Sequence, residues 1–268
     1  SADTTTLVAT VKDAGGTTIS GATVTWATSS SSVATVSSAG LVTAVADGMA
    51  TITATSGSAT AITSVTVAQV AMSVTLSPDS VSFSSLSDIA TVTATVRDAN
   101  DSTITSPTVT WSSSDTAVVT VSSAGVVTSV AEGTATITAT SGSASATASV
   151  TVTQVAASIT LSPTTVSFAS LGDTATLVAT VKDANDNTMS GATITWTTSN
   201  ASVATVSTAG VVTSVGNGTA TITATSGSVN ATATATVSQV AASVTLAPTS
   251  LSFASVDDTT TLVPTVKD

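Results

Sequence analysis

The sequence predicts an all-β protein made of a row of antiparallel β-sandwiches of one kind. Three observations support this prediction. The 268-residue chain repeats itself at one fixed period without insertion or deletion, apolar residues alternate with Thr and Ser over short stretches, and no segment has the 3.6-residue period of an amphipathic helix. Repetition at one fixed period indicates an array of equal structural units.

Residue types that occur once in each repeat mark its register. The chain has three tryptophans, three phenylalanines and three glutamines, and each type recurs at the interval that separates positions 26 and 111. These positions are Trp26, Trp111 and Trp196; Phe83, Phe168 and Phe253; and Gln69, Gln154 and Gln239. Residues 1–13 recur in similar form at residues 256–268. We therefore expect the sequence to start and stop within a repeat and to be a fragment or a mature segment.

The repeat from residue 71 to residue 155 contains seven segments that alternate like half-buried strands. In the first segment, Val74, Leu76, Val81 and Phe83 are separated by polar residues, and the later segments continue this alternation. The predicted strands cover residues 73–84, 91–97, 108–111, 117–121, 126–130, 134–140 and 145–152. The inward residues include Val92, Ala94 and Val96 in the second strand, Val109 and Trp111 in the third, and Ala135, Ile137 and Ala139 in the sixth.

Turn residues separate these strands. The tetrapeptide Ser-Ser-Ala-Gly at 122–125, the pair Glu132-Gly133 and the tripeptide Ser-Gly-Ser at 141–143 each follow an alternating segment. Seven short strands with turns every 8–12 residues predict a β-sandwich. We expect Trp111 on the third strand to be the large buried core residue, with Trp26 and Trp196 in the same role.

The repeat divides the chain into two whole units and two partial ones. We expect a partial domain at 1–70 that lacks its first strands, whole domains at 71–155 and 156–240, and the start of a further domain at 241–268. Residues 153–158 join the two whole units with no Gly/Ser-rich stretch, which indicates a semi-rigid rod.

Residues 31–58 and their repeat at 116–143 carry a family resemblance. The segment SSVATVSSAGLVTAVADGMATITATSGS resembles the bacterial immunoglobulin-like group 2 domain, as does VKDANDNTMSGATITW at 181–196. The resemblance implies tandem Ig-like antiparallel β-sandwiches arranged as an elongated rod. Such domains occur in the stalks of intimin- and invasin-like adhesins, in other secreted surface proteins and in some phage tail decorations. It therefore implies an extracellular or cell-surface location.

The composition excludes several classes of function. The chain has no Cys, His or Tyr, so that thiolate metal sites, histidine-ligated zinc and the Ser-His-acid triad are all excluded. Fifteen acids and four bases give a formal charge of −11, which opposes nucleic-acid binding. No run of about 18 apolar residues predicts a membrane span in this segment. We expect no enzyme activity and no resident cofactor, apart from the calcium ion considered next.

Acidic residues recur in turns that should meet where two units join. Tracing the strands up and down places one group at the end of unit 71–155 and another at the start of the next unit, facing each other near Gln154. The groups are Asp88, Asp115 and Glu132 on one side and Asp183 and Asp186 on the other. Hard oxygen ligands suit Ca²⁺, so the sequence raises the hypothesis of an inter-domain calcium site. The alternative is that these residues serve only as turn formers.

Three functions fit these observations. The leading hypothesis is a structural spacer or stalk segment in a long secreted surface fibre or adhesin, whose partners are the neighbouring repeats of the same chain and like chains in a fibre. The first alternative is a ligand-binding Ig-like module that recognises a polysaccharide or a host protein. The inward positions of the Trp and Phe residues oppose this alternative, because sugar binding usually uses exposed aromatic rings. The second alternative is a decoration of a phage tail or virion.

The incomplete first unit leaves a further question open. Residues 1–70 lack the strand that corresponds to 73–84, which leaves an open sheet edge. Either the continuing chain supplies that strand, or residues 241–255 of a neighbouring chain supply it by strand addition. The 13-residue overlap between the two ends favours the first of these.

Overall fold

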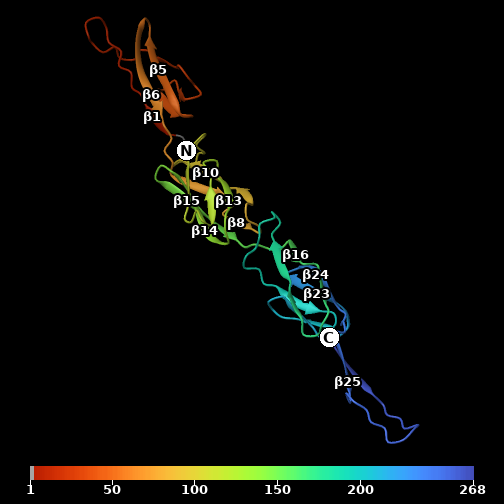
Figure 1. Ribbon diagram of the computed structural model, residues 1–268. Helices are drawn as coiled ribbons and strands as arrows, with labels where there is room; N and C mark the ends of the chain where they lie inside the picture. The colour runs from red at the N-terminus through yellow and green to blue at the C-terminus, as the bar shows by residue number, and fades with distance from the viewer. Residues whose placement is uncertain (1–2) are drawn as a thin grey trace.

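The computed structural model describes residues 3–268, and within them every regular element is a β-strand. We number the units as the sequence predicts them: unit 1 (1–70), unit 2 (71–155), unit 3 (156–240) and unit 4 (241–268). Figure 1 shows them one after another along an elongated rod, with unit 1 at one end and the narrow unit 4 at the other. The boundaries at 70, 155 and 240 stay a prediction. Among residues 3–268 no helix is long and apolar enough to cross a lipid bilayer.

Units 2 and 3 contain the same nine strands. In unit 2 they are β7 (Ser73–Ser77), β8 (Ser80–Phe83), β9 (Ile89–Thr91), β10 (Thr93–Arg97), β11 (Thr110–Ser113), β12 (Val119–Val121), β13 (Val126–Ser129), β14 (Gly133–Ser141) and β15 (Ala144–Val152). In unit 3 they are β16 (Ser158–Ser162), β17 (Thr165–Phe168), β18 (Thr174–Thr176), β19 (Val178–Lys182), β20 (Thr195–Thr198), β21 (Ala204–Val206), β22 (Val211–Ser214), β23 (Gly218–Ser226) and β24 (Val229–Val237).

The strands of unit 2 form a sandwich of two sheet layers. One sheet has the order β11-β14-β15-β8, a second has the order β12-β13-β9, and β10 pairs with β7. The count is nine rather than the expected seven because the first two strands each change partner along their length. After Thr91, for example, the chain leaves β13 and continues as β10 against β7. One pair differs from the antiparallel expectation, since β8 runs parallel to β15.

The core of each unit is made of small apolar side chains that alternate with exposed polar ones. In β14 the alternation places Ala135, Ile137 and Ala139 inward, and Ile137 and Ala139 have no exposed surface. In unit 3 the equivalent Ile222 is also fully buried. Alternation of this kind is the pattern of a sheet with one face on the core and one in water. The tandem sandwich fold that the sequence predicts is therefore confirmed.

The tryptophans are half-buried and not buried, which corrects the expectation for them. Trp111 packs against the core, but it lies on β11, an edge strand of its sheet, so that part of its ring meets solvent. The ring covers Gly125, whose backbone has φ of 76°. A Cβ atom at Gly125 would lie 2.9 Å from Cζ2 of Trp111. Glycine at this turn therefore allows both the left-handed backbone and the close approach of the ring.

Units 1 and 4 contain fewer strands. Unit 1 has β1 (Thr4–Thr6), β2 (Thr25–Thr28), β3 (Ala34–Val36), β4 (Leu41–Ala44), β5 (Gly48–Ser56) and β6 (Ala59–Val67). Its sheets have the orders β2-β5-β6 and β1-β4-β3, so that the described part of unit 1 has no strand equivalent to β7 or β8. Unit 4 has only β25 (Ser243–Ala247) and β26 (Val263–Lys267), which pair with each other.

Candidate functional site

The junction between units 2 and 3 is organised around the carboxylate of Asp183. This residue follows β19, and its side chain is 2% exposed. One oxygen, Oδ1, accepts hydrogen bonds from the backbone N–H groups of Asn185 and Asn187 in its own loop, at 3.0 and 2.9 Å. The other oxygen, Oδ2, accepts bonds from Nε2 of Gln154 and from the backbone N–H of Leu86, both at 2.9 Å. One carboxylate thus connects unit 3 to the segment that follows β15 and to the β8–β9 loop of unit 2.

These hydrogen bonds lower the pKa of the Asp183 carboxyl. Burial raises the pKa, but the bonds from Gln154, Leu86, Asn187 and Asn185 outweigh burial and lower it from 3.8 to about 2. All four donors favour the ionised form. The junction therefore holds a buried negative charge that four hydrogen-bond donors stabilise.

Two asparagine side chains add direct contacts across the same junction. Nδ2 of Asn185 donates to Oδ1 of Asp88 at 2.8 Å and to the backbone oxygen of Leu86 at 2.9 Å. Nδ2 of Asn187 donates to the same oxygen of Leu86 at 2.9 Å. The loop of unit 3 therefore binds both the donor and the acceptor of the Leu86 backbone.

The connecting segment is itself held by hydrogen bonds on both sides. The backbone N–H of Gln154 donates to Oε1 of Glu132 at 2.9 Å, and the N–H of Val155 donates to the oxygen of Ser84 at 2.9 Å. Two residues later, the N–H of Ala157 donates to the oxygen of Lys182 in unit 3 at 2.8 Å. A linker with these bonds has little freedom to act as a hinge.

Two of the five predicted metal ligands serve their own turns instead. Oδ1 of Asp115 accepts the N–H of Ala117 at 2.9 Å. Asp186 has φ of 64°, a conformation that Asp and Asn tolerate better than most residues, and its carboxylate lies 3.8 Å from Nζ of Lys182. Its side chain is 87% exposed, so this ion pair contributes little to stability.

The structure therefore brings together only part of the predicted metal site. Asp88, Glu132 and Asp183 each make a contact at the junction, but with amide and backbone N–H donors. Within residues 3–268 no three acidic side chains lie close enough to one another to hold a metal ion. Calcium binding at this junction stays a prediction. Asp115 and Asp186 act within their own turns, as the alternative expects, whereas the other three acids accept hydrogen bonds at the junction.

The central contact recurs at each junction of the rod. Nε2 of Gln69 donates to Asp98 at 2.9 Å, as Gln154 does to Asp183, and Nε2 of Gln239 donates to Asp268 at 2.6 Å. In each pair the two residues are 29 positions apart in the sequence. We call this contact the Gln–Asp clasp.

Side contacts of the clasp recur as well. Nδ2 of Asn100 donates to Asp3 at 3.0 Å, as Asn185 does to Asp88, and the N–H of Leu171 donates to Asp268 at 3.2 Å, as Leu86 does to Asp183. One position of the repeat is occupied by Asp47, Glu132 and Asn217 in units 1, 2 and 3. In each unit the side-chain oxygen at this position accepts the backbone N–H of the glutamine 22 residues later. This role needs an oxygen but no charge, which explains why an amide can replace a carboxylate there.

The acceptor of the clasp, Asp183, was predicted at this junction from the sequence, but its donors were not. Gln154 was recognised only as a marker of the repeat, and no role was predicted for Asn185 or Asn187. The signal was present, because the three glutamines and the aspartates at 98, 183 and 268 keep the same register in every repeat. Polar residues that repeat in constant register beside a linker are candidates for contacts between units.

Comparisons with known proteins identify the repeat. The family model of the bacterial Ig-like domain (group 2) matches residues 1–67, 70–152 and 155–237. The chain is 37% identical over 124 residues to Ice-binding protein 1 of Shewanella frigidimarina, a match that covers 46% of this chain and 14% of that protein. The chain therefore spans about a seventh of the length of this curated relative.

Two solved structures show weak similarity to the chain. The surface layer protein SbsC, domains 1–6, matches with 24% identity and a TM-score of 0.32, covering 89% of this chain and 38% of that one. Invasin, a bacterial integrin-binding protein, matches with 19% identity and a TM-score of 0.42, covering 88% and 56%. Both likenesses are too weak to carry any argument about function.

Proposed function

Because the chain belongs to the family of bacterial Ig-like domains of group 2, we propose that it is a structural spacer, a stalk segment of a surface-exposed fibre or adhesin. The observation that carries this proposal is the Gln–Asp clasp, which repeats at 69–98, 154–183 and 239–268. A spacer must keep consecutive units in line, and a hydrogen-bonded contact that recurs at every joint, with Asp183 buried at the central one, supports that role.

The surface of the rod supports a spacer over a binding module. In units 2 and 3 the aromatic rings that could stack on a sugar are largely covered, since Phe83 and Phe168 are only 7% and 6% exposed and the tryptophans are half-buried. The pKa values that depart clearly from normal belong to Asp98, Asp183 and Asp268, and all three are lowered by the hydrogen bonds of the clasp. The lowered pKa values of these three carboxyls are therefore explained by the contacts that join the units.

The match to an ice-binding protein fits the same proposal. It covers 14% of that protein, a share about the size of one or two repeats. We infer that the two chains share the spacer repeat, and that the activity named for the relative belongs to the rest of its length. Recognition of a polysaccharide or a host protein, or a place on a phage tail, remains the alternative for this chain.

A distance measurement between neighbouring units tests the spacer role. The chain has no Cys, so that Ser143→Cys and Ser228→Cys would introduce two unique labelling sites in equivalent exposed turns of units 2 and 3. Spin labels there should give one narrow distance distribution centred at roughly 40 Å, since the strands of one unit set the spacing. Asp183→Ala should broaden the distribution, whereas Asp115→Ala, which removes a carboxylate bound only to its own turn, should not. A broad distance distribution in the doubly labelled chain that keeps both Asp183 and Asp115 would show a flexible tether and contradict the proposal.

A further inference from the structure

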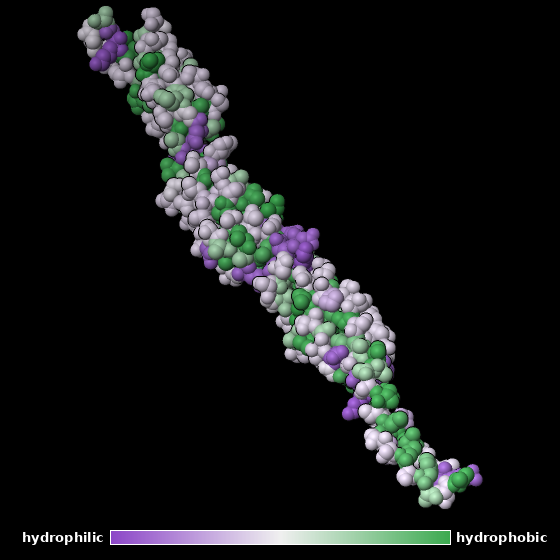
Figure 2. Space-filling view, in the orientation of Figure 1, coloured by the Kyte–Doolittle hydropathy of each residue, from purple (hydrophilic) through white to green (hydrophobic). Residues whose placement is uncertain are grey.

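The basic residues of the chain all occupy one position of the repeat. There are four of them, Lys12, Arg97, Lys182 and Lys267. In the two whole units, Arg97 ends β10 and Lys182 ends β19, and the next residue of each is the aspartate of a Gln–Asp clasp. Figure 2 shows strongly hydrophilic side chains in patches near the places where units meet. A protease that cuts after Lys or Arg therefore finds its bonds in units 2 and 3 only beside the joints.

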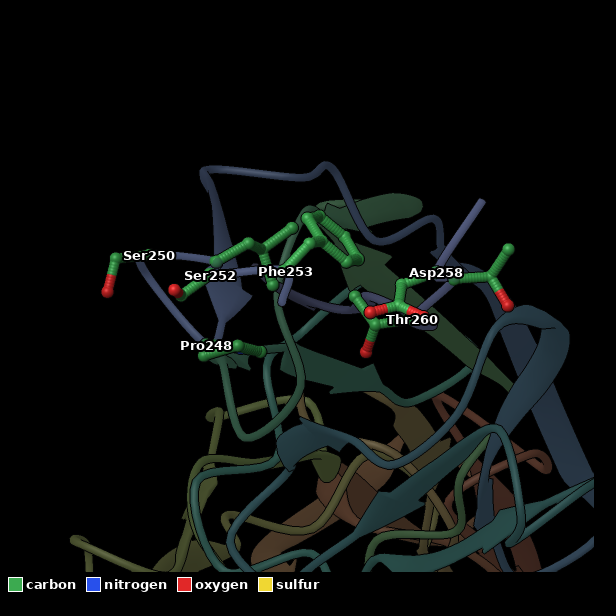
Figure 3. A pocket seen from close by; sticks show the side chains of 8 residues that line it. Pro248, Ser250, Ser252, Phe253, Asp258 and Thr260 are labelled. Carbon is green, nitrogen blue, oxygen red and sulfur yellow. The ribbon is translucent and has the colours of Figure 1, made fainter. Parts of the chain in front are cut away.

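The segments that proteases usually nick contain no such bond. Exposed loop tips are the common sites of nicking in folded proteins. The hairpin turns at 141–143 and 226–228 contain no Lys or Arg. Residues 248–260, whose side chains surround an open hollow in Figure 3, contain none either. In the whole units, susceptibility to this class of protease is therefore decided at Arg97 and Lys182.

The peptide bond between Lys182 and Asp183 is held by hydrogen bonds on both of its sides. Its carbonyl oxygen accepts the N–H of Ala157, in the linker, at 2.8 Å, and its N–H donates to the backbone oxygen of Asn187 at 3.0 Å. A serine protease must place the carbonyl oxygen of the bond that it cuts in its oxyanion hole. Because Ala157 already occupies this oxygen, the hydrogen bond with Ala157 must break before cleavage.

The clasp also keeps the residues after this bond in a tight loop. Oδ1 of Asp183 binds the backbone N–H groups of Asn185 and Asn187, while Oδ2 is held by two donors of unit 2. A protease binds the residues on both sides of the bond in an extended conformation. The loop cannot extend while the carboxylate of Asp183 stays in the joint. Cleavage after Lys182 therefore requires local opening of the joint.

The bond between Arg97 and Asp98 is held in the same way. The backbone oxygen of Arg97 accepts the N–H of Met72 at 2.8 Å, and the N–H of Asp98 donates to the oxygen of Ser102 at 3.0 Å. One carboxylate oxygen of Asp98 accepts two backbone N–H groups of its own loop at 2.9 Å, and the other accepts Nε2 of Gln69. The same set of bonds thus surrounds the one bond after a basic residue in each whole unit.

We propose that each joint is a gate for proteolysis, at which a protease of trypsin-like specificity cuts the rod only when the Gln–Asp clasp opens. The side chains of Arg97 and Lys182 are 39% and 40% exposed, so that the backbone and not the basic group limits access. In the net reaction, water adds OH to the carbonyl carbon of Lys182 and a proton to the nitrogen of Asp183, and the C–N bond between them breaks. The cut interrupts unit 3 between β19 and β20. This inference goes beyond the spacer role, and its failure would leave the distance measurement as a separate test of that role.

Limited digestion of the full chain with trypsin, read by mass spectrometry, tests the gate. In the unsubstituted chain, cleavage after Lys182 should be about 100-fold or more slower than in an unfolded peptide of residues 176–190. Gln154→Ala removes a donor of the clasp without changing the residues beside the bond that trypsin cuts. Because cleavage follows the population of the open joint, this substitution should speed cleavage after Lys182 by about 10- to 100-fold.

Gln69→Ala is the matched control, because it removes the equivalent donor from the other joint. It should speed cleavage after Arg97 and leave cleavage after Lys182 unchanged, whereas Gln154→Ala should do the reverse. In Gln154→Ala the amide of the fully buried Ile222 should keep its protection from hydrogen exchange, which distinguishes an open joint from an unfolded unit 3. The proposal would be overturned by cleavage of the unsubstituted chain at the rate of the peptide, by equal acceleration at both bonds in either variant, or by faster cleavage that accompanies loss of protection at Ile222.

Discussion

Replacing Asp183 by Asn should uncouple units 2 and 3 while preserving the size of the side chain. The carboxylate accepts two backbone bonds from its own loop on Oδ1 and two bonds from unit 2 on Oδ2, and Nδ2 of Asn187 adds longer bonds to both oxygens, at 3.3 and 3.4 Å. An asparagine has one oxygen and one NH₂ group, so that it can keep only one of these pairs. The NH₂ group then points at two N–H donors, either those of Gln154 and Leu86 or those of the loop.

The magnitude follows from the number and kind of bonds lost. A hydrogen bond to an ionised group contributes about 1.5–3 kcal/mol, and two such bonds are lost. Part of this is regained because the separated donors can meet water. We therefore expect the junction to weaken by about 2–4 kcal/mol.

Hydrogen exchange at the Leu86 amide measures this directly, because Leu86 belongs to unit 2 and its acceptor belongs to unit 3. A loss of about 2–4 kcal/mol corresponds to a loss of protection of about 30- to 1000-fold at this amide. Asp115→Asn is the matched control, since Asp115 bonds only within its own turn, and it should leave Leu86 protected.

Acid should have the same effect on the unsubstituted chain. The pKa of Asp183 is lowered from 3.8 to about 2 in the folded junction, so its stabilising contribution is complete above about pH 5 and is lost as the pH falls toward 2. Allowing for solvent screening, the loss is about 1–2 kcal/mol. Protection at Leu86, corrected for the intrinsic exchange rate, should fall over this range in the unsubstituted chain and stay flat in Asp183→Asn. Asparagine could still accept the N–H of Leu86 with its one oxygen, whereas alanine cannot. A Leu86 amide that stays protected at pH 7 in both Asp183→Asn and Asp183→Ala would contradict this explanation, since the units would then be held by other contacts.

Three further outcomes are expected. Gly210→Ala should destabilise unit 3 by about 3 kcal/mol in thermal denaturation, because its Cβ would lie 2.5 Å from the backbone oxygen of Leu177 and φ is +77°. Gly227→Ala is the control: it has a positive φ but no atom near the added Cβ, so that unit 3 should lose only about 1 kcal/mol of stability. Ser85→Ala should leave the melting temperature unchanged or raise it slightly, because the buried Oγ of Ser85 has no hydrogen-bond partner to lose; a clear decrease would reveal a partner. Millimolar Ca²⁺ should give no calorimetric heat and no shift in melting temperature relative to chelator, because amide donors already meet the junction carboxylates; a measurable shift would establish the calcium site.

The fold could be predicted from the sequence because two simple patterns, the alternation of apolar and polar residues and the constant repeat period, indicate it. Period-two alternation of Val and Ala with Thr and Ser can be satisfied only by strands with one face inward, and the constant repeat period shows where each unit recurs. The direction of the strands then placed Asp88 and Asp183 at the same joint, where Asn185 does connect their two loops. Local pattern and chain direction were sufficient for this much.

The rest depended on contacts that alternation does not describe. The parallel pairing of β8 with β15 arises between segments about 70 residues apart, and no local pattern encodes it. The exposure of Trp111 depends on β11 being an edge strand, which is a property of the whole sheet. At the junction, the acids were visible as charges, but which N–H groups would meet them depends on the relative position of two units.

The constant 29-residue separation of the clasp has a consequence for how such a chain can change its length. Because every joint uses the same pair of positions, a duplication or deletion of one whole period joins compatible segments wherever its end points fall within the repeat. Recombination between repeats can therefore lengthen or shorten the rod in steps of one unit, with each new joint already carrying its glutamine and its aspartate. The reach of the rod is then a trait that selection can adjust without redesigning any contact.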